Sequence, residues 1–427
     1  MNNPCWDWIS RALSRAAIMR IALVAAFGLG VVATLPSQAQ TFTLLHSFNG
    51  ASQGLAPTAT LLRDAEGNLY GTTSKGGRHG LGSVFKLDKA GKLTVLHAFM
   101  GGLDGATPYA GLIRDNEGNL YGTAFSGGGS SNCYGGCGIV FKLSPAGKET
   151  VLHRFAGGRN DGANPYAPLL RDAHGNLYGT TVYGGDGGGC NSACGVVFKL
   201  DAKGKETILY VFGGYFDGGY PFGGLVMDAQ GNLYGTTEIG GALGYNYCPE
   251  VYCGTVFRLD PTGKETLLYQ FTGGSDGAFP QAGVILDKKG NLFGTTFGGG
   301  DPSCEFGSGC GVVYKLDATG KETTLYAFKG STDGGYPEAV LVRDAAGNFF
   351  STTWAFGNTG CLSGGGCGVV FKVDKTGKET VLHGFAGNGT DGGNSSAGLI
   401  FDEQGNLYGT ASAGGTGNAG TVFKITP

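Results

Sequence analysis

The heptapeptide Gly67-Asn68-Leu69-Tyr70-Gly71-Thr72-Thr73 decides the fold, because it returns six more times with little change. The later copies begin at Gly118, Gly175, Gly231, Gly290, Gly347 and Gly405. Their spacing runs from 51 residues (67 to 118) to 59 residues (231 to 290). A motif that recurs at such a period through most of a chain indicates a repeat architecture rather than an ordinary globular domain. We therefore treat the 427-residue chain as one assembly of similar units.

Each unit contains four short segments with the character of β-strands. In the first unit these are residues 59–64, 68–73, 83–88 and 93–99, each rich in β-branched and aromatic residues and bounded by Gly or Asp. Four strands per unit is the composition of a propeller blade. Glycine accounts for 85 residues, but it follows no three-residue period and aromatic residues are plentiful, so neither collagen nor disorder fits.

The two ends of the chain predict how the ring closes. Residues 42–48 match the fourth strand of a unit, and residues 421–425 match the third. Pairing these segments would complete the last unit and remove the free strand edges. The sequence therefore predicts an all-β protein, a seven-bladed β-propeller with four antiparallel strands per blade, forming a single domain over residues 40–427. The blades are expected to begin near residues 59, 110, 167, 223, 282, 339 and 397.

The first 39 residues differ from the repeats. Three arginines precede an apolar run at residues 21–35, which is followed by Pro36 and the small-residue site Ser37-Gln38-Ala39. This pattern predicts a secretory signal peptide over residues 1–39, cleaved after Ala39. A membrane anchor is the alternative, but about 15 apolar residues are short for a span of roughly 20. We expect a secreted, extracellular or periplasmic protein.

Charge limits the possible partners. Residues 1–39 hold three Arg and one Asp, so the remaining chain has 30 − 3 = 27 basic and 33 − 1 = 32 acidic side chains, a net charge of −5. No basic patch is visible, which argues against nucleic acid as a partner. We expect no membrane span after leader cleavage, and we expect a monomer.

Ten of the eleven cysteines follow the leader and fall into five close pairs. The pairs are Cys133-Cys137, Cys190-Cys194, Cys248-Cys253, Cys304-Cys310 and Cys361-Cys367. Each lies in the loop between the second and third strands of a unit. A zinc site would need four ligands brought together, whereas these pairs belong to different blades. We predict five local disulfides, which suits an oxidising compartment.

Four repeat segments together resemble a known family. GNLYGTT, GxVFKLD, GKETVLHxF and GGxDGAxPYAGL are similar to the GloVer (Gloeobacter/Verrucomicrobia-type) tandem repeat of exported bacterial proteins, and the match covers essentially the whole chain after the leader. The resemblance implies extracellular placement and little about activity. A looser similarity, in the Gly-Asn-Leu-aromatic step, is to seven-bladed virginiamycin B lyase-like propellers.

Histidine would be the first place to look for catalysis, but four of the six share one repeat position. They are His46, His97, His153 and His383, and the other units place Tyr210, Tyr269 and Tyr326 there. An exchange of His with Tyr indicates a packing site with a polar tip rather than a metal ligand or a general base. We find no His, Asp and Ser set outside the repeat, so we expect no catalytic residues and no metal.

The loop between consecutive blades carries the first set of candidate ligand-binding residues. Its Gly-Gly-x-Asp-Gly pattern repeats Asp104, Asp161, Asp217, Asp276, Asp333 and Asp391, with Gln53 in the seventh unit. A ring of carboxylates on the face of the cysteine loops would recognise hydroxyls or cations. In the alternative, each Asp accepts hydrogen bonds from its own turn. The closely spaced ligands of an EF-hand are missing, so we expect no cofactor, with calcium as a minor option.

Aromatic residues on the same face form the second candidate set: Tyr109, Tyr166, Tyr220, Phe279, Tyr336 and Trp354. Aromatic faces beside Asp and Asn suit sugar recognition, and loop packing is the alternative.

The leading functional hypothesis is a secreted, non-catalytic binding or interaction module for a glycan or a protein ligand. The alternatives are an extracellular enzyme that cleaves polysaccharide or a lactone at the channel mouth, and a structural surface protein. Polar residues outside the repeat pattern, converging on one side of the channel, would favour the enzyme.

Overall fold

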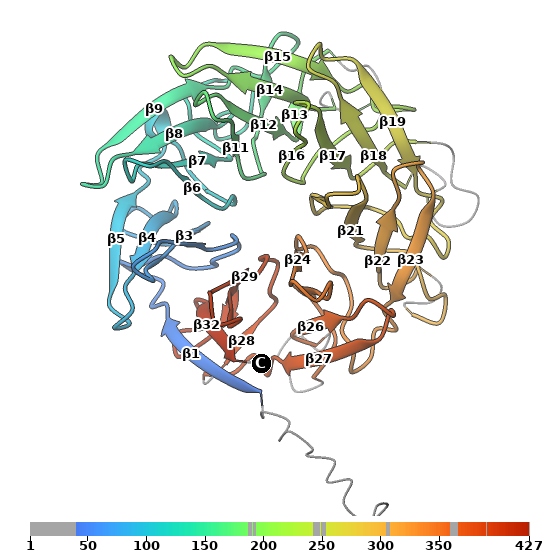
Figure 1. The fold of residues 1–427 in the computed structure, drawn as a ribbon. Helices are drawn as coiled ribbons and strands as arrows, with labels where there is room; N and C mark the ends of the chain where they lie inside the picture. The colour runs from blue at the N-terminus through green and yellow to red at the C-terminus, as the bar shows by residue number, and fades with distance from the viewer. Residues whose placement is uncertain are drawn as a thin grey trace, which may run out of the picture. The chain divides into compact units, whose positions relative to one another are not determined.

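The computed structural model describes residues 40–186, 190, 194–241, 248, 253–304, 308–358, 366–389 and 391–426. The predicted signal peptide lies outside these residues. Seven four-stranded antiparallel sheets are arranged in a ring, as the sequence predicts (Figure 1). The one helix in the described residues is the 3-10 turn η1 (Gly102–Asp104). No helix in this part of the chain has the length and apolar character that a membrane crossing requires.

The strands of the first four blades run in chain order from the channel to the rim. Blade 1 contains β2 (Leu62–Arg63), β3 (Leu69–Thr73), β4 (Ser83–Leu87) and β5 (Leu93–Ala98). Blade 2 contains β6 (Ile113–Arg114), β7 (Leu120–Ala124), β8 (Ile139–Leu143) and β9 (Glu149–Arg154). Blade 3 contains β11 (Leu170–Arg171), β12 (Leu177–Thr181), β14 (Val196–Leu200) and β15 (Glu206–Val211). Blade 4 contains β16 (Val226–Met227), β17 (Leu233–Thr237), β18 (Thr255–Leu259) and β19 (Glu265–Gln270).

The remaining blades repeat this order, with one exception at the end of the chain. Blade 5 contains β20 (Ile285–Leu286), β21 (Leu292–Thr296), β22 (Val312–Leu316) and β23 (Glu322–Ala327). Blade 6 contains β24 (Val342–Arg343), β25 (Phe349–Thr352), β26 (Val369–Val373) and β27 (Glu379–Gly384). Blade 7 contains β29 (Ile400–Phe401), β30 (Leu407–Ala411), β32 (Thr421–Thr426) and β1 (Thr41–Ser47). Two small loop sheets pair β10 (Gly162–Ala163) with β13 (Tyr183–Gly184), and β28 (Gly392–Gly393) with β31 (Ala413–Gly414).

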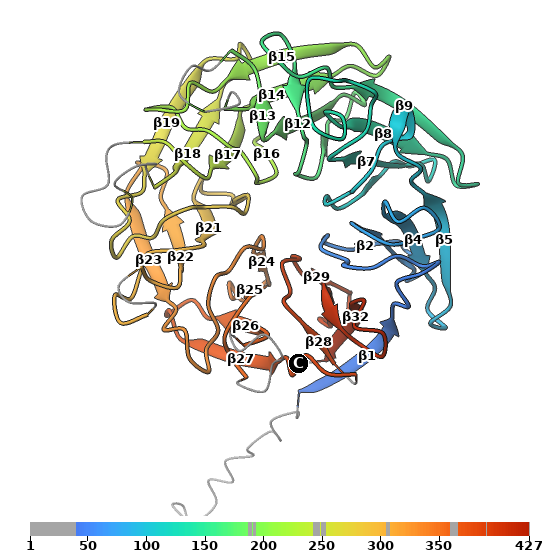
Figure 2. The same cartoon turned by 180° about the vertical axis from the view of Figure 1, so that it is seen from behind.

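Blade 7 is completed by β1, the first strand of the described residues. Strand β1 pairs antiparallel with β32, from Thr41 opposite Thr426 to Ser47 opposite Thr421. Seen from behind, β1 lies along the outer edge of the last blade (Figure 2). The predicted closure by strand exchange is confirmed.

The innermost strands are shorter than expected. Residues 59–64 were expected to form a strand, but only Leu62–Arg63 of β2 pair with β3. The segment faces the channel and has a strand partner on one side only. Ala59 and Thr60 instead line the channel.

The heptapeptide builds each blade through close packing. Gly71 lies against the ring of Phe85 on the neighbouring strand, and a Cβ atom there would come 2.6 Å from the ring. In the preceding turn, Asp64 accepts hydrogen bonds from the Asn68 amide at 2.8 Å and from the Tyr70 hydroxyl at 3.0 Å. These aspartates therefore close hairpins.

The blades adhere through a repeated aromatic pair. A Phe at the end of each outer strand packs edge-on against a ring in the third strand of the next blade, as in Phe48 with Phe85, whose centroids are 5.1 Å apart. The other pairs are Phe99–Phe141, Phe155–Phe198, Phe212–Phe257, Phe271–Tyr314, Phe328–Phe371 and Phe385–Phe423. All these rings are buried, so the hydrophobic core runs through the seams between blades.

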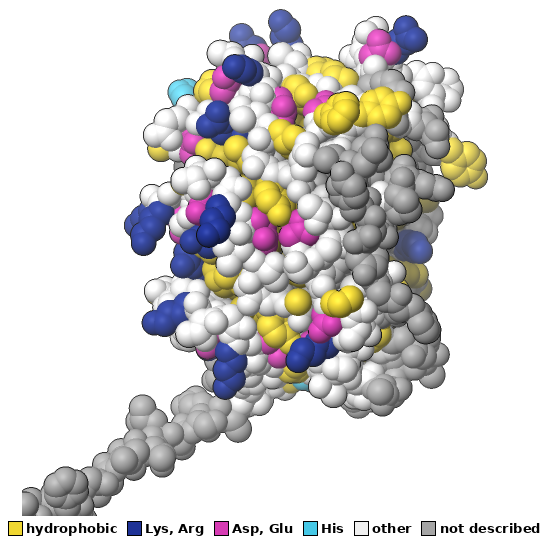
Figure 3. Space-filling model, turned by 90° about the vertical axis from the view of Figure 1, so that its right-hand side faces the viewer, with side chains coloured by type: hydrophobic (Ala, Val, Ile, Leu, Met, Phe, Trp, Pro, Cys, Tyr) yellow, Lys and Arg dark blue, Asp and Glu magenta, His cyan; other side chains and the backbone are white. Residues whose placement is uncertain are grey.

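Charged side chains of both signs lie on the outer surface of the ring. In the edge-on view, Lys and Arg project at separate points with Asp and Glu between them, and the part of the surface described there shows no continuous basic patch (Figure 3).

Candidate functional site

The loop aspartates lie between neighbouring blades, near the rim. Each accepts a hydrogen bond from a main-chain amide of its own loop: Asp104 from Met100, Asp161 from Ala156, Asp217 from Gly213, Asp276 from Thr272, Asp333 from Lys329 and Asp391 from Ala386. In the Tyr-bearing blades the outer-strand hydroxyl also donates, for example Tyr210 to Asp217 at 2.9 Å. The contacts of these aspartates therefore agree with the alternative, in which each carboxylate accepts hydrogen bonds from its own turn.

A second carboxyl group enters the same seams from the next blade, and sequence reasoning missed it. The Glu that opens the outer strand lies beside the Asp of the preceding blade at Glu149, Glu206, Glu265, Glu322 and Glu379. Burial, and then the neighbouring Asp, raise the pKa of Glu379 to about 7. The repeated GKET segment, replaced by Leu93 and Phe42 in the other two units, was the available signal.

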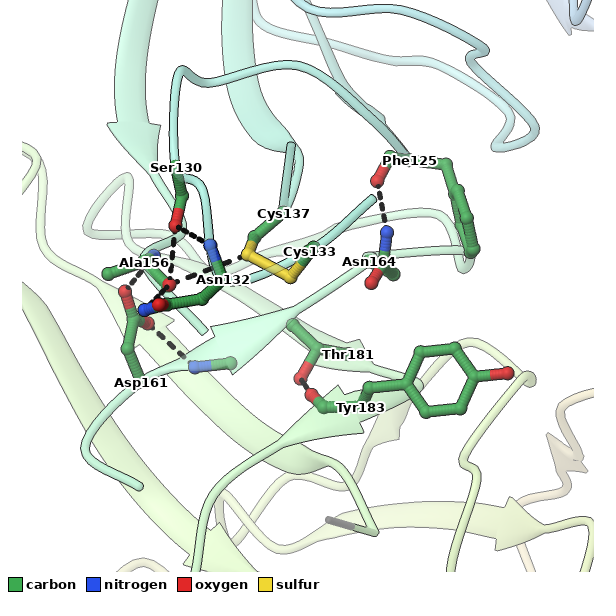
Figure 4. Close-up of a disulfide and its surroundings, with 11 residues drawn as sticks. Phe125, Ser130, Asn132, Cys133, Cys137, Ala156, Asp161, Asn164, Thr181 and Tyr183 are labelled. Carbon is green, nitrogen blue, oxygen red and sulfur yellow. Dashed lines mark hydrogen bonds between the residues drawn. A yellow bond between two sulfur atoms is a disulfide. The ribbon is translucent and has the colours of Figure 1, made fainter. Parts of the chain in front are cut away.

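Four of the five predicted disulfides are present: Cys133–Cys137, Cys190–Cys194, Cys248–Cys253 and Cys304–Cys310. Cys361 of the fifth pair lies outside the described residues. Around the first disulfide, the Ser130 hydroxyl and the Asn132 amide both donate to the Ala156 carbonyl, at 2.7 and 2.9 Å (Figure 4). The cysteine loop is thereby fastened to the loop that leads into the next blade.

Three candidate aromatic residues support the loops. Tyr220, Phe279 and Tyr336 precede loop prolines and have φ values of 57°, 58° and 59°. Their amides donate to carbonyls of the cysteine loops, at Cys194, Cys253 and Cys310. A left-handed conformation is unusual for aromatic residues, and this hydrogen bond accompanies it in each loop. Trp354 is 40 % exposed and donates its amide to the Tyr336 carbonyl.

The remaining two candidate aromatics, Tyr109 and Tyr166, belong to a set that the sequence analysis did not assemble. The residue after the loop proline, or at its equivalent position, points into the channel mouth in every blade. The set is Thr58, Tyr109, Tyr166, Phe222, Gln281, Glu338 and Ser396, and it lines a cavity of about 160 Å³. Small residues such as Ala110, Gly111 and Gly223 line the adjoining part of the channel. We call these seven residues the mouth set.

One side of the mouth is aromatic. Tyr109 and Tyr166 stack with centroids 4.8 Å apart, and Phe222 meets Tyr166 edge-on at 5.2 Å. Phe125 contacts Tyr109 from the neighbouring loop at 5.5 Å. Burial, assisted by the nearby Glu338, raises the pKa of Tyr166 well above its ordinary value. Tyr166 is therefore a neutral phenol at physiological pH and is unsuited to act as a general base.

The opposite side of the mouth is acidic and polar. Gln281 donates to Glu238 at 2.7 Å, and Glu238 comes from the end of the strand that carries the heptapeptide in blade 4. Burial raises the pKa of Glu338, a hydrogen bond with Ser396 lowers it, and the charge of Glu238 raises it again. Burial likewise raises the pKa of Glu238, against the effect of Gln281. Glu338 thus lines the mouth, and Glu238 lies close enough for its charge to act on that carboxyl group.

This two-sided mouth can hold a ligand with an apolar face and a polar edge. The aromatic residues offer a flat wall, while the carboxyl, amide and hydroxyl groups accept or donate hydrogen bonds. The signal for the mouth set was present in the sequence, because this is a position next to the loop proline at which the copies disagree.

The architecture and the mouth define a seven-bladed β-propeller with an asymmetric channel entrance. The family model of the Gloeobacter/Verrucomicrobia repeat matches residues 24–248, 131–304 and 249–427. The chain belongs to this repeat family, which confirms the resemblance inferred from its motifs. No curated protein matches it.

Solved structures share the fold. The extracellular domain of a hybrid two-component system from B. thetaiotaomicron aligns with a TM-score of 0.55 and 14 % identity, over 90 % of this chain and 39 % of that one. A 6-phosphogluconolactonase, so named, from Bacteroides uniformis aligns with a TM-score of 0.48 and 17 % identity, over 81 % and 96 % of the two chains. This chain spans about two fifths of the first of these structures, and at such identities the likeness concerns the fold alone.

Proposed function

We propose that the protein is an exported binding module that takes up a saccharide unit of an extracellular glycan at the channel mouth. The observation that carries the proposal is the division of the mouth set into an aromatic side, Tyr109, Tyr166 and Phe222, and a polar side, Gln281, Glu338 and Ser396. A pyranose ring has the matching character, with apolar C–H faces and hydroxyl groups around its edge. The 160 Å³ cavity suits one such unit rather than a long chain segment.

Several features support export. The disulfides suit an oxidising compartment, and the basic and apolar leader predicted from residues 1–39 would deliver the chain there. The other class of partner that would fit the mouth is a protein ligand. Such a ligand would present a side chain that has, like a pyranose ring, an apolar face and a polar edge.

A second candidate, a glycan-cleaving enzyme, is favoured by the Glu238 and Glu338 pair. Polar residues that depart from the repeat pattern converge on one side of the channel. Most glycoside hydrolases use two carboxyl groups for catalysis. Such catalysis needs one group to be protonated while the other is ionised, so their environments should move the two pKa values apart. Burial raises the pKa of both carboxyl groups, the charge of Glu238 adds to this rise at Glu338, and the hydrogen bond from Gln281 opposes it at Glu238.

A glycan array followed by calorimetry tests the proposal. The purified protein should retain a defined set of glycans, and Tyr166→Ala should weaken binding by about tenfold, since loss of a stacking contact of about 1.4 kcal/mol is of that size. Phe216→Ala is the matched control, because Phe216 is an aromatic residue that is 70 % exposed in an inter-blade loop and is not in the mouth set. A protein that binds no glycan, or equal losses in the two variants, would contradict the proposal.

The enzyme candidate requires a separate measurement. Incubation of a retained glycan with the protein, followed by assay of new reducing ends, should show no turnover if the mouth only binds. Turnover that disappears in Glu338→Gln would establish the second candidate instead.

A further inference from the structure

The seam between blades 2 and 3, away from the channel mouth, brings together three groups able to ligate a metal ion. His153 lies on β9, Asp161 lies in the loop after it, and Glu206 opens β15 of the next blade. The Nε2 atom of His153 is 3.6 Å from Asp161 Oδ1 and 3.6 Å from Glu206 Oε2. One ligand atom from each residue lies within 4.8 Å of the others. The side chains of the three residues are 14–18 % exposed.

These separations are too long for hydrogen bonds and fit a shared ion. Within the described part of the chain, His153 Nε2 is a buried atom without a hydrogen-bond partner, whereas Nε2 of His97 and of His383 each lies within hydrogen-bond distance of an Asp. Bonds of about 2.1 Å from a metal ion to nitrogen and oxygen place tetrahedral ligand atoms ~3.4 Å apart. Two amides, from Ala156 and Gly162, hold the Asp161 carboxylate in position. The three ligand atoms thus lie within 4.8 Å of one another, with both carboxylates 3.6 Å from the imidazole nitrogen.

In other seams, the residues at the same repeat positions make direct hydrogen bonds or ring contacts with one another. Where the unit has Tyr, the hydroxyl donates directly to the Asp, as Tyr269 does to Asp276 at 3.0 Å. In the seam between blades 6 and 7, His383 is hydrogen-bonded to Asp391 at 3.1 Å, and the Glu position is taken by Phe42, which stacks on the imidazole at 4.0 Å.

The seam between blades 1 and 2 has the same three residue types but a different geometry. His97 is 3.3 Å from Asp104, within hydrogen-bond distance, and 3.9 Å from Glu149. In both seams one ligand atom from each residue lies within 4.8 Å of the others, and the seam of His153 differs in its longer separation between His and Asp.

We propose that His153, Asp161 and Glu206 bind one divalent first-row transition-metal ion, such as Zn²⁺ or Mn²⁺, and that this ion fastens blade 2 to blade 3. One imidazole nitrogen and two carboxylate oxygens are a ligand set that these ions accept, whereas Ca²⁺ prefers a larger set made of oxygen alone. Bound water would complete the coordination, since the side chains retain some exposure. The alternative is that no metal ion binds and that His153 is protonated. The imidazolium would then form ion pairs with the carboxylates of Asp161 and Glu206.

Calorimetric titration of the metal-free protein with ZnCl₂ and MnCl₂ distinguishes the metal ion from the proton. We expect saturable binding of at least one of these ions and a rise in the melting temperature on its addition, reversed by EDTA. CaCl₂ should give a markedly smaller response. Absence of saturable binding of both transition-metal ions would overturn the proposal in favour of the proton.

Two variants localise the binding. Glu206→Gln keeps the size of the side chain and removes a charged ligand, and His153→Tyr installs the residue that three other units carry at this position, so both variants should fold. Each should weaken metal binding by about tenfold or more. The matched control is Glu265→Gln, at the same repeat position in a Tyr-bearing seam, and it should leave the affinity unchanged. Equal affinity in Glu206→Gln and Glu265→Gln would overturn the proposal.

Discussion

Thr410 Oγ1 donates a hydrogen bond of 3.1 Å to the carbonyl oxygen of Ala59, which lies 351 residues earlier in the chain. The same threonine of the heptapeptide makes the same bond in the other seams, for example Thr72 to Ala110 at 3.0 Å and Thr236 to Ala282 at 2.8 Å. Thr410 and Ala59 are both buried, with exposed fractions of 1 % and 3 %. The motif that forms the strands therefore also joins each blade to the next.

Removing this hydroxyl should weaken the closure of the ring. Thr410→Val keeps the shape but leaves the buried Ala59 carbonyl without its donor, so we expect a loss of about 1–3 kcal/mol in the free energy of unfolding. Urea denaturation measures this change. Thr94→Val, on the exposed face of β5, is the control and should be nearly neutral. Equal losses in the two variants would show that the bond does not matter.

The seam glutamates should make the protein less stable as pH rises. The pKa of Glu379 is raised from 4.5 to about 7, chiefly by burial and then by Asp333. The folded state therefore binds more protons than the unfolded state between about pH 5 and 7, and stability falls as pH increases through that window. Glu265 and Glu322, also raised to about 7, act in the same direction. Melting temperatures recorded from pH 5 to pH 8 should decline.

Glu379→Gln isolates one such group. The amide stays neutral, so the variant should be more stable than the parent at pH 8, and its melting temperature should depend less on pH. The exposed turn residue Glu66 provides the control, and Glu66→Gln should leave the pH profile unchanged. A steeper profile in Glu379→Gln would contradict the predicted direction.

The ten cysteines after residue 39 should be unreactive until the disulfides are reduced. Cys137 and Cys194 are fully buried, and their loops bond to the loops of the next blade. Alkylation of the oxidised protein followed by mass spectrometry should label none of the ten cysteines, and five or more labelled thiols would refute the assignment. Cys137→Ser should cost about 2 kcal/mol, the chain-entropy value for so short a loop.

The mouth should gain stability when its acidic pair is neutralised. Glu338→Gln places in blade 6 the residue that blade 5 already has at Gln281, and it removes the repulsion from Glu238. We expect a higher melting temperature at pH 8 together with about tenfold weaker ligand binding, because the buried charge that destabilises the fold is also the proposed binding group. A lower melting temperature would indicate that Glu338 has a structural role.

The fold could be predicted from the sequence because its determinants are local and repeated. Residues 67–73 specify a turn and a strand through their own neighbours, and the matching ends of the chain specify the pairing of β1 with β32. The short inner strands were not predicted, because the length of β2 depends on the crowding of seven blades around a channel.

The candidate site was predicted only in part, because its residues meet across the ring. Tyr109 and Tyr166 attracted notice as aromatic residues, whereas Gln281 and Glu338 are ordinary residues until the closed ring brings them to one opening. Glu206 was overlooked for a related reason. Its partner His153 belongs to another blade, so no local spacing links the two.

The positions that form the mouth are separable from those that form the ring. Thr58, Phe222 and Glu338 occupy the same structural position, although one is small, one aromatic and one charged. The scaffold thus accepts very different side chains there, while the strands, the buried ring pairs and the threonine bonds stay constant. If the mouth binds a ligand as proposed, we expect its specificity to change through point substitutions at seven sites, or through exchange of whole blades, without a new fold.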